Sequence, residues 1–159
     1  MVEVSLHFRE EGEPVLGREL IPVVIRETPE MLWCGTASDA ALRIIKSTED
    51  NDRWEVTART PEGVLVGYAV VVPDFDSNIG PVAGVQWLFV LPEFRHMSVL
   101  MGIYQGIVTA AHYEELDVLA YTRRLGLGRY ELTYKRIGRP AKDGQEDQEG
   151  REEGRQVSR

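Results

Sequence analysis

Cysteine and histidine are scarce in this chain. Its 159 residues include one cysteine, Cys34, and three histidines that lie far apart in the sequence. A single cysteine cannot form an internal disulfide, so nothing in the sequence requires an oxidising compartment. The spacing of the cysteine and the histidines does not match that of a metal site, and we expect no bound metal.

Positive charge and long apolar runs are also missing. The chain has 18 Lys and Arg against 26 Asp and Glu, for a formal net charge of −8. This balance disfavours a nucleic-acid partner, because such binding neutralises phosphates with basic side chains. No apolar run approaches the roughly 20 residues that span a bilayer, and the acidic N-terminal segment does not resemble a signal peptide. We therefore expect no membrane partner and a cytoplasmic location.

The most informative stretch is residues 84–111. Its first part, Val85 to Leu91, is a nearly continuous apolar run, which predicts a strand covered on both faces. Pro92 ends that strand, because proline cannot donate to a central ladder. Apolar residues then recur at helical spacing from Val99 to Ala111, and we expect Ser98 to cap this helix. A strand that leads directly into a helix N-terminus presents unpaired N–H groups that suit an anion.

The rest of the chain supplies further strands and helices. Residues 2–9 alternate apolar and polar side chains as a half-buried strand does. One or two short helices are expected within residues 18–32, and another begins after Thr36 or Ser38 and stops near Ser47. Residues 54–60 and 64–72 form a hairpin around a four-residue turn, and residues 73–81 read as a loop. The pattern predicts an α/β (α+β) fold with a mostly antiparallel sheet flanked by helices.

The C-terminal part of the chain contains one ambiguous segment, residues 117–122, and one polar segment, residues 139–159. Residues 117–122, DVLAYT, alternate well enough for a strand but also fit a helical turn capped by Asp117, and we favour the strand. From residue 139 the chain has almost nothing apolar to bury. We therefore predict one domain over residues 1–138 and a polar, charged tail over residues 139–159 that is disordered when free.

Three phrases of the sequence resemble the GCN5-related N-acetyltransferase (GNAT) superfamily. The run LFVLPEFR followed by a helix is similar to the family's central strand, phosphate loop and helix. VLVGYAVVV resembles its second hairpin strand, and LGLGRYELTYKRI resembles its end segment and closing strand. The resemblance covers roughly residues 54–137. It implies a mixed, mostly antiparallel GNAT-like sheet, although the family normally has a further helix where this chain has only residues 117–124.

The resemblance also implies a coenzyme A site. The backbone of Leu88, Phe89 and Val90 would bond the pantetheine arm of acetyl-CoA as an added strand does. The family's loop Q/R-x-x-G-x-G/A corresponds to Arg95, Ser98 and Leu100, where Leu100 replaces a small residue and could occlude the site unless it turns into the core. His96 lies in the same loop and could contact an anion.

The catalytic positions of the family are less well matched. The glutamate that often serves as base corresponds to Gly84, and a second acidic position is occupied by Trp87. The family's tyrosine acid corresponds to Thr122, with Tyr121 one residue away, so Tyr121 is the candidate catalytic residue. An ordered water could take the place of the base. Asp74 and Asp76, just before the central strand, could bind a cationic acceptor amine.

Two functions of different classes follow from these observations. The first is an acetyl-CoA-dependent N-acetyltransferase that acts on an amine. The second is a GNAT-fold structural or interaction protein without catalysis, resembling virion components of tailed bacteriophages, in which the tail would order against a neighbour. In that case the protein would lie in the host cytoplasm or the virion. Apolar surface left by the short end segment also predicts a homodimer.

Overall fold

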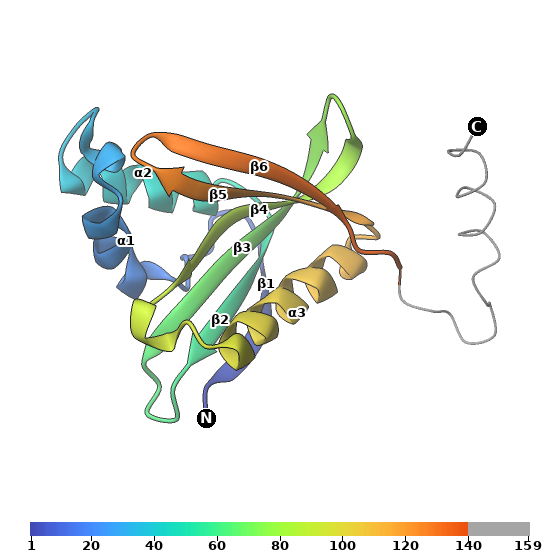
Figure 1. The fold of residues 1–159 in the computed structure, drawn as a ribbon, viewed down its shortest axis with the longest axis horizontal. Coiled ribbons are helices and arrows are strands. Elements are labelled where there is room, and N and C mark those ends of the chain that lie inside the picture. Colours follow the sequence, from blue (N-terminus) through green and yellow to red (C-terminus); the bar gives the residue numbers. More distant parts are fainter. Residues whose placement is uncertain (140–159) are drawn as a thin grey trace.

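The computed structural model describes residues 1–139 as a six-stranded sheet with helices on both faces (Figure 1). The strands lie in sequence order, and every neighbouring pair is antiparallel except β4 and β5, which are parallel. The predicted α+β class with a mixed, mostly antiparallel sheet is thus confirmed. The strands are β1 (Glu3–Arg9), β2 (Arg53–Arg59), β3 (Leu65–Asp76), β4 (Gly80–Val90), β5 (Val118–Gly126) and β6 (Arg129–Arg136). The helices are α1 (Ile21–Glu27), α2 (Ala37–Glu49) and α3 (Met97–Tyr113), with 3-10 turns η1 (Arg18–Leu20), η2 (Pro29–Leu32) and η3 (Pro92–Phe94).

The sheet separates two cores. Helix α3 lies along one face, and α1 and α2 lie on the other (Figure 1). The α3-side core includes Val56, Val71, Ile103, Ile107 and Leu119, all buried. On the other face, Leu20, Tyr68 and Val70 form one buried group, and Ile21, Ile25, Ala40 and Ile44 form a second between α1 and α2.

Local sequence signals account for the helix and turn boundaries on the α1–α2 side. Thr36 caps α2 in a capping box, in which its hydroxyl accepts from the Asp39 N–H and the Asp39 carboxylate accepts from the Thr36 N–H. Pro22 lies in the first turn of α1, where its missing N–H costs least. Gly63 has a φ of +87°, which supports the β2–β3 turn. The predicted hairpin and the short helices within residues 18–32 are confirmed.

The predicted loop over residues 73–81 is wrong. Strand β3 continues to Asp76 and β4 begins at Gly80, so only three residues turn. The Asp76 carboxylate accepts from the N–H groups of Asn78 and Ile79 and fixes this turn. This end of the hairpin projects beyond both cores, so its side chains have no apolar partners and are polar (Figure 1). Backbone pairing between β3 and β4 stabilises it instead.

Two expectations for the central segment are also corrected. The strand is not covered on both faces, because Leu88 is 53% exposed beyond the point where β5 leaves β4. Ser98 does not cap α3: the N-cap is His96, and Ser98 already lies in the first turn of the helix. The short η3 turn brings the chain into the helix two residues earlier than the apolar spacing indicates.

The strand interpretation of residues 117–122 is confirmed, since they lie at the start of β5. Within the described part of the chain, no helix separates β5 from β6, and a tight turn at Leu127 and Gly128 joins them. The predicted tail begins at the last described residue, so its predicted disorder concerns residues outside the described part.

A buried ion pair anchors the N-terminal loop to the sheet. Arg53 and Glu55, adjacent on one face of β2, are both fully buried and pair at 2.9 Å. Arg53 also donates to the carbonyl of Glu13 at 2.6 Å, and Glu55 accepts from the Leu16 N–H and the Tyr68 hydroxyl. Burial and the neighbouring carboxylate raise the pKa of Tyr68 far above its ordinary value, so its hydroxyl remains a donor. This network holds residues 10–17 against the sheet ahead of η1 and α1.

Replacing Arg53 by methionine should destabilise the protein strongly, because it leaves Glu55 as an unpaired buried charge. We expect Arg53→Met to lower the free energy of unfolding by about 3–5 kcal/mol, measured by urea denaturation. Arg123→Met is the matched control, because Arg123 is exposed and its ion pair with Glu131 is 3.8 Å long. Equal stabilities of the two variants would contradict a structural role for the buried pair.

Candidate functional site

A β-bulge at Gln86 divides β4 into two parts. In the β3–β4 register Val71 pairs with Val85 and Val70 pairs with Trp87, so Gln86 is the extra residue. The Gln86 side-chain amide donates to the carbonyl of Ser47 at the end of α2, 3.2 Å away. A bulge bends its strand and increases the local twist, which can end pairing with the strand on the other side.

The parallel pairing of β4 with β5 ends just before this bulge. It comprises only Ala83 with Leu119 and Gly84 with Ala120, after which the two strands diverge. The edge of β4 from Val85 to Val90 therefore has no strand partner on the β5 side within the described chain. Peptide groups on such an edge can bond an extended ligand as a further strand would.

Three predicted cofactor residues lie on this open edge. Leu88 projects toward the α3 face, as shown by its pairing with Ala69 of the α3-side core. Phe89 packs on the α1–α2 side, and Val90 is buried at the end of the strand. Their side chains differ in environment, while their backbones share the open edge, which matches a role through the main chain alone.

The start of α3 lies directly after this strand. Its first intrahelical bond runs from the Leu100 N–H to the His96 carbonyl at 3.0 Å, so the N–H groups of Met97, Ser98 and Val99 precede it. These groups and the positive end of the helix dipole are the ordinary components of an anion site. His96 and Ser98 are exposed here, and Leu100 is 38% exposed rather than turned into the core.

Arg95 already has partners on the α1 side. Its Nε donates to the Val90 carbonyl at 3.0 Å, and its guanidinium lies 3.7 Å from the Glu27 carboxylate. The same group stacks over the Phe89 ring at 5.8 Å from the centroid. Arg95 thus ties the end of β4 to the end of α1, and it would have to exchange Glu27 for a phosphate.

We call the gap between the diverging strands β4 and β5 the wedge; its closed end is the pairing at Ala83 and Gly84. A cavity of about 280 Å³ lies beside this closed end. The polar residues that line it are Asp74, Asp76, Gln86, Tyr121 and Thr122, and we call it the acidic cavity. Gly84 lies in its wall, where an added Cβ would come within 3.6 Å of the Asp74 Cβ. The resemblance places a glutamate base at the position of Gly84. In this chain Asp74, from the neighbouring strand β3, lies beside that position.

The two aspartates differ in their surroundings. The Tyr134 hydroxyl donates to Asp76 at 2.6 Å, and this bond with the turn N–H groups lowers the pKa of that carboxyl. Asp74 is exposed and accepts only from the neighbouring Phe75 N–H in the described structure. Asp76 is thus held in place as a structural anion, and Asp74 keeps acceptor capacity.

Tyr121 and Thr122 lie on opposite faces of β5. Tyr121 packs at the rim of the α3-side core and also lines the acidic cavity. Thr122 also lines that cavity, opposite Leu132 of β6. The structure therefore brings Tyr121 close to the wedge, while its core contacts also account for its presence.

A carboxylate clamp, invisible in the sequence, holds the β5–β6 hairpin to η2. Glu30 accepts two bonds from the Arg124 guanidinium and one from the Tyr130 hydroxyl at 2.9 Å. Trp33 packs against the hairpin turn, where an added Cβ on Gly128 would approach its ring to 2.7 Å. The partners lie about a hundred residues apart, and no spacing rule could have joined them. This clamp fixes how far β5 departs from β4.

The comparisons with known proteins agree with this geometry at the level of the fold. No protein-family model matches the chain. No curated protein matches its sequence. The solved aminoglycoside 6'-N-acetyltransferase AAC(6')-Ih from Acinetobacter baumannii is similar with a TM-score of 0.53 and 18% identity, over 77% of this chain and 81% of that one.

Two further solved structures show the same similarity. AAC(6')-Iy, in complex with a CoA-containing bisubstrate analogue, has a TM-score of 0.51 and 20% identity over 77% of this chain and 81% of that one. A GNAT-family acetyltransferase from Staphylococcus aureus Mu50 has a TM-score of 0.50 and 10% identity over 76% and 73%. The chain thus has the fold of the GNAT acetyltransferases.

The described residues contain neither a metal-binding cluster nor a membrane-spanning helix. Across residues 1–139 no group of three or more His, Cys, Asp or Glu is arranged to hold a metal ion. No helix in the same residues is both long and apolar enough to cross a membrane.

The Glu30 clamp should make stability depend on pH in the acid range. The Arg124 guanidinium, with help from Tyr130, lowers the pKa of Glu30 from its ordinary 4.5 to about 2. Because the folded pKa is depressed, the stabilisation is complete above pH 4.5 and is lost as the pH falls toward 2. Glu30→Gln should lower the melting temperature at pH 7, and the difference in melting temperature from the unmutated protein should narrow steadily as the pH falls from 4.5 toward 2.

The control for this series is Glu62→Gln, a charge loss on the exposed β2–β3 turn. Differential scanning calorimetry should give it the melting temperature of the unmutated protein at each pH. A gap for Glu30→Gln that stays constant down to pH 3 would show that the clamp carboxylate contributes nothing through its charge.

Proposed function

We propose that this protein is an acyl-CoA-dependent N-acyltransferase that transfers an acetyl group to an amine. The observation that carries the proposal is the wedge between β4 and β5, opened by the Gln86 bulge and facing the first turn of α3. A free strand edge suits the amides of a pantetheine arm, and a helix N-terminus suits a pyrophosphate. The AAC(6')-Iy complex with a CoA-containing analogue supports the choice of ligand.

The cofactor would use three parts of the chain. The backbone of Leu88 to Val90 would bond the pantetheine arm, and the N–H groups of Ser98 and its neighbours would face the pyrophosphate. Arg95 would leave its half-exposed ion pair with Glu27 and bind the pyrophosphate, which carries two negative charges instead of one. Leu100 would flank the phosphates, and His96 at the N-cap would add a further contact.

The acidic cavity would receive the acceptor amine. Its carboxylates favour a cationic ligand, and its position beside Gly84 is next to the strand that would hold the thioester. Asp74, directly or through a water, would accept the amine proton. The nitrogen would then attack the thioester carbonyl, so that the C–N bond forms and the C–S bond breaks. The departing thiolate would take a proton, for which Tyr121 of β5 is the candidate donor.

A second candidate function is a GNAT-fold structural or interaction protein without turnover. Gly84 offers no base of its own, and Leu100 remains exposed where the resemblance calls for a small residue. The β5–β6 hairpin exposes Leu125, Leu127, Tyr130 and Leu132, which a partner or a second copy would cover. In this role the protein would act in an assembly such as a phage virion rather than free in the cytoplasm.

Binding of acetyl-CoA is the first test. A ligand at ~100 times its dissociation constant adds ~2.7 kcal/mol, which should raise the melting temperature by several degrees. Arg95→Ala should remove most of this shift, and Arg123→Ala, a change at an exposed arginine of β5, should leave it intact. No shift at millimolar acetyl-CoA would reject the first function and favour the second.

The acceptor side can be tested by release of free CoA thiol with a panel of primary amines. Asp74→Asn should lower the rate about 10²- to 10⁴-fold, the usual contribution of a general base. Gly84→Glu should restore much of it in the Asp74→Asn background, because an added Cβ at residue 84 meets only ordinary contacts of 3.5–3.6 Å. Asp50→Asn at the C-cap of α2 is the control. Unchanged turnover in Asp74→Asn would show that Asp74 is not the general base.

A further inference from the structure

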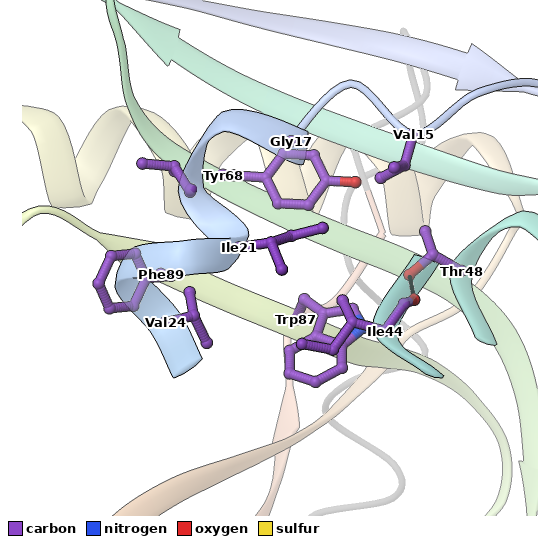
Figure 2. Close-up of a pocket in the computed structure, with 10 residues that line it drawn as sticks. Val15, Gly17, Ile21, Val24, Ile44, Thr48, Tyr68, Trp87 and Phe89 are labelled. Carbon is purple, nitrogen blue, oxygen red and sulfur yellow. Dashed lines mark hydrogen bonds between the residues drawn. The ribbon is translucent and has the colours of Figure 1, made fainter. Parts of the chain in front are cut away.

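The helices cover the middle of the sheet closely but leave the β5–β6 hairpin open. Between α1, α2 and the sheet, the side chains leave only a cavity of about 30 Å³, walled by Ile44 and Trp87 among others (Figure 2). The β5–β6 hairpin, in contrast, exposes four large apolar side chains to between 49% and 58%, namely Leu125, Leu127, Tyr130 and Leu132. Apolar side chains grouped on one exposed element are typical of an interaction surface.

Strand β6 is also an open edge of the sheet. It is the last strand in the sheet order, so within residues 1–139 only β5 pairs with it. It is eight residues long, contains no proline, and pairs with β5 without a register shift from Arg136 to Tyr130. Proteins protect such an edge with a short strand, a bulge, a proline or charged side chains, and β6 has only the charges. The arrangement of these charges therefore decides what can pair with it.

A second copy of the chain can extend the sheet by laying its own β6 antiparallel to the first. The two copies are then related by a two-fold axis perpendicular to the sheet, so opposed residues lie on the same face. Lys135 lies over the Tyr104 ring of α3, which places the odd-numbered residues of β6 on the α3 face. The axis must therefore pass through a residue. Only Leu132 and Thr133 allow seven opposed positions, over residues 129–135 or 130–136.

The charges of β6 distinguish these two registers. With the axis at Leu132, Arg129 lies opposite Lys135 of the second copy, twice by symmetry, and like charges directly opposite each other are destabilising. With the axis at Thr133, Glu131 lies opposite Lys135 of the second copy, again twice. Leu132 then lies opposite Tyr134 of the second copy, and the two threonines lie opposite each other. Only the register centred on Thr133 is complementary in charge.

The two charged groups of this register are only weakly engaged within their own chain. The ion pair of Glu131 with Arg123 is 3.8 Å long, and the two side chains are 53% and 71% exposed. The Lys135 ammonium lies 4.5 Å from the centroid of the Tyr104 ring, and the residue remains exposed. Exposed contacts of this kind contribute little to stability, so both groups can take up a new partner.

The opposite edge strand, β1, carries a similar charge pattern but uses it differently. Glu3 and Arg9 lie at its two ends. The Arg9 guanidinium donates to the Pro14 carbonyl at 2.7 Å and pairs with Glu13 at 3.6 Å. Because Arg9 already binds the N-terminal loop, β1 is the control edge for the test below.

We propose that β6 is a homodimer interface, in which two copies pair their β6 strands antiparallel about Thr133 and join their sheets into one. This inference specifies the surface and the register of a dimer, and it does not depend on the proposed function, because strand pairing needs no cofactor. Leu132 also lines the acidic cavity. The register therefore brings Tyr134 of the second copy beside that cavity.

The test is sedimentation velocity of the full-length protein over a range of concentrations, with charge reversals on β6. The unmutated protein should form a dimer. Glu131→Lys and Lys135→Glu should each weaken the dimer about ten- to a hundredfold, because each variant places like charges opposite each other twice. An equimolar mixture of the two variants should dimerise again, because residue 131 of each copy then faces the opposite charge at residue 135 of the other.

Glu3→Lys on β1 is the matched control and should leave the dimer unchanged, since Glu3 is an exposed acidic residue at the other edge of the sheet. A protein that stays monomeric at every concentration would overturn the interface. A dimer that withstands both charge reversals, or a mixture of the two variants that stays monomeric, would overturn the register. A dimer lost only in Glu3→Lys would assign the interface to β1 instead.

Hydrogen exchange of the unmutated protein gives a measure that needs no variant. The N–H groups on the outer edge of β6 should exchange more slowly at concentrations where the dimer forms than at concentrations where the monomer prevails, because the second strand accepts their hydrogen bonds. Protection that appears elsewhere in the chain and not on β6 would contradict the pairing.

Discussion

The bulge at Gln86 is the feature on which the other parts of the site depend. One extra residue in β4 coincides with the end of its pairing to β5, which is limited to two residue pairs. The same bulge gives Gln86 its bond to α2 and places Trp87 and Phe89 together on the α1–α2 face. The open strand edge fits this local change in register, and the acidic cavity lies at its closed end.

The described chain reaches the GNAT fold with fewer elements than the resemblance leads one to expect. Strand β5 turns directly into β6, and the Glu30 clamp with Trp33 holds the hairpin to η2. An ionic clamp replaces apolar packing as the restraint on β5. It leaves Leu125, Leu127 and Leu132 exposed, which is the surface that the homodimer prediction invokes. Similarity to the solved acetyltransferases at 20% identity or less concerns the arrangement of elements, so activity rests on the groups in the wedge.

The chemistry of the wedge depends on how charges are distributed around Gly84. Gly84, at the position of the family's base, has no side chain, but Asp74 of β3 is its diagonal neighbour, with its Cβ 3.6 Å from where a Cβ of residue 84 would lie. Asp76 is bound to Tyr134 and to the turn, so its charge supports the hairpin more than the reaction. On the cofactor side, Arg95 is paired with Glu27 and Leu100 is exposed. An active enzyme would require Arg95 to leave Glu27 and Leu100 to make room for a phosphate, whereas a non-catalytic GNAT-fold protein would not.

The sequence by itself determined the fold class, the hairpin, the strand at residues 117–122 and the long helix, because apolar periodicity and turn residues act over a few positions. It also located the strand and loop that resemble a coenzyme A site. It could not foresee the extended β3–β4 hairpin, since backbone pairing needs no apolar pattern, or the helix start at His96. Tertiary structure alone decided the Glu30 clamp and the closeness of Asp74 to Gly84. These depend on residues distant in sequence or on the exact register of neighbouring strands, and no local pattern encodes either.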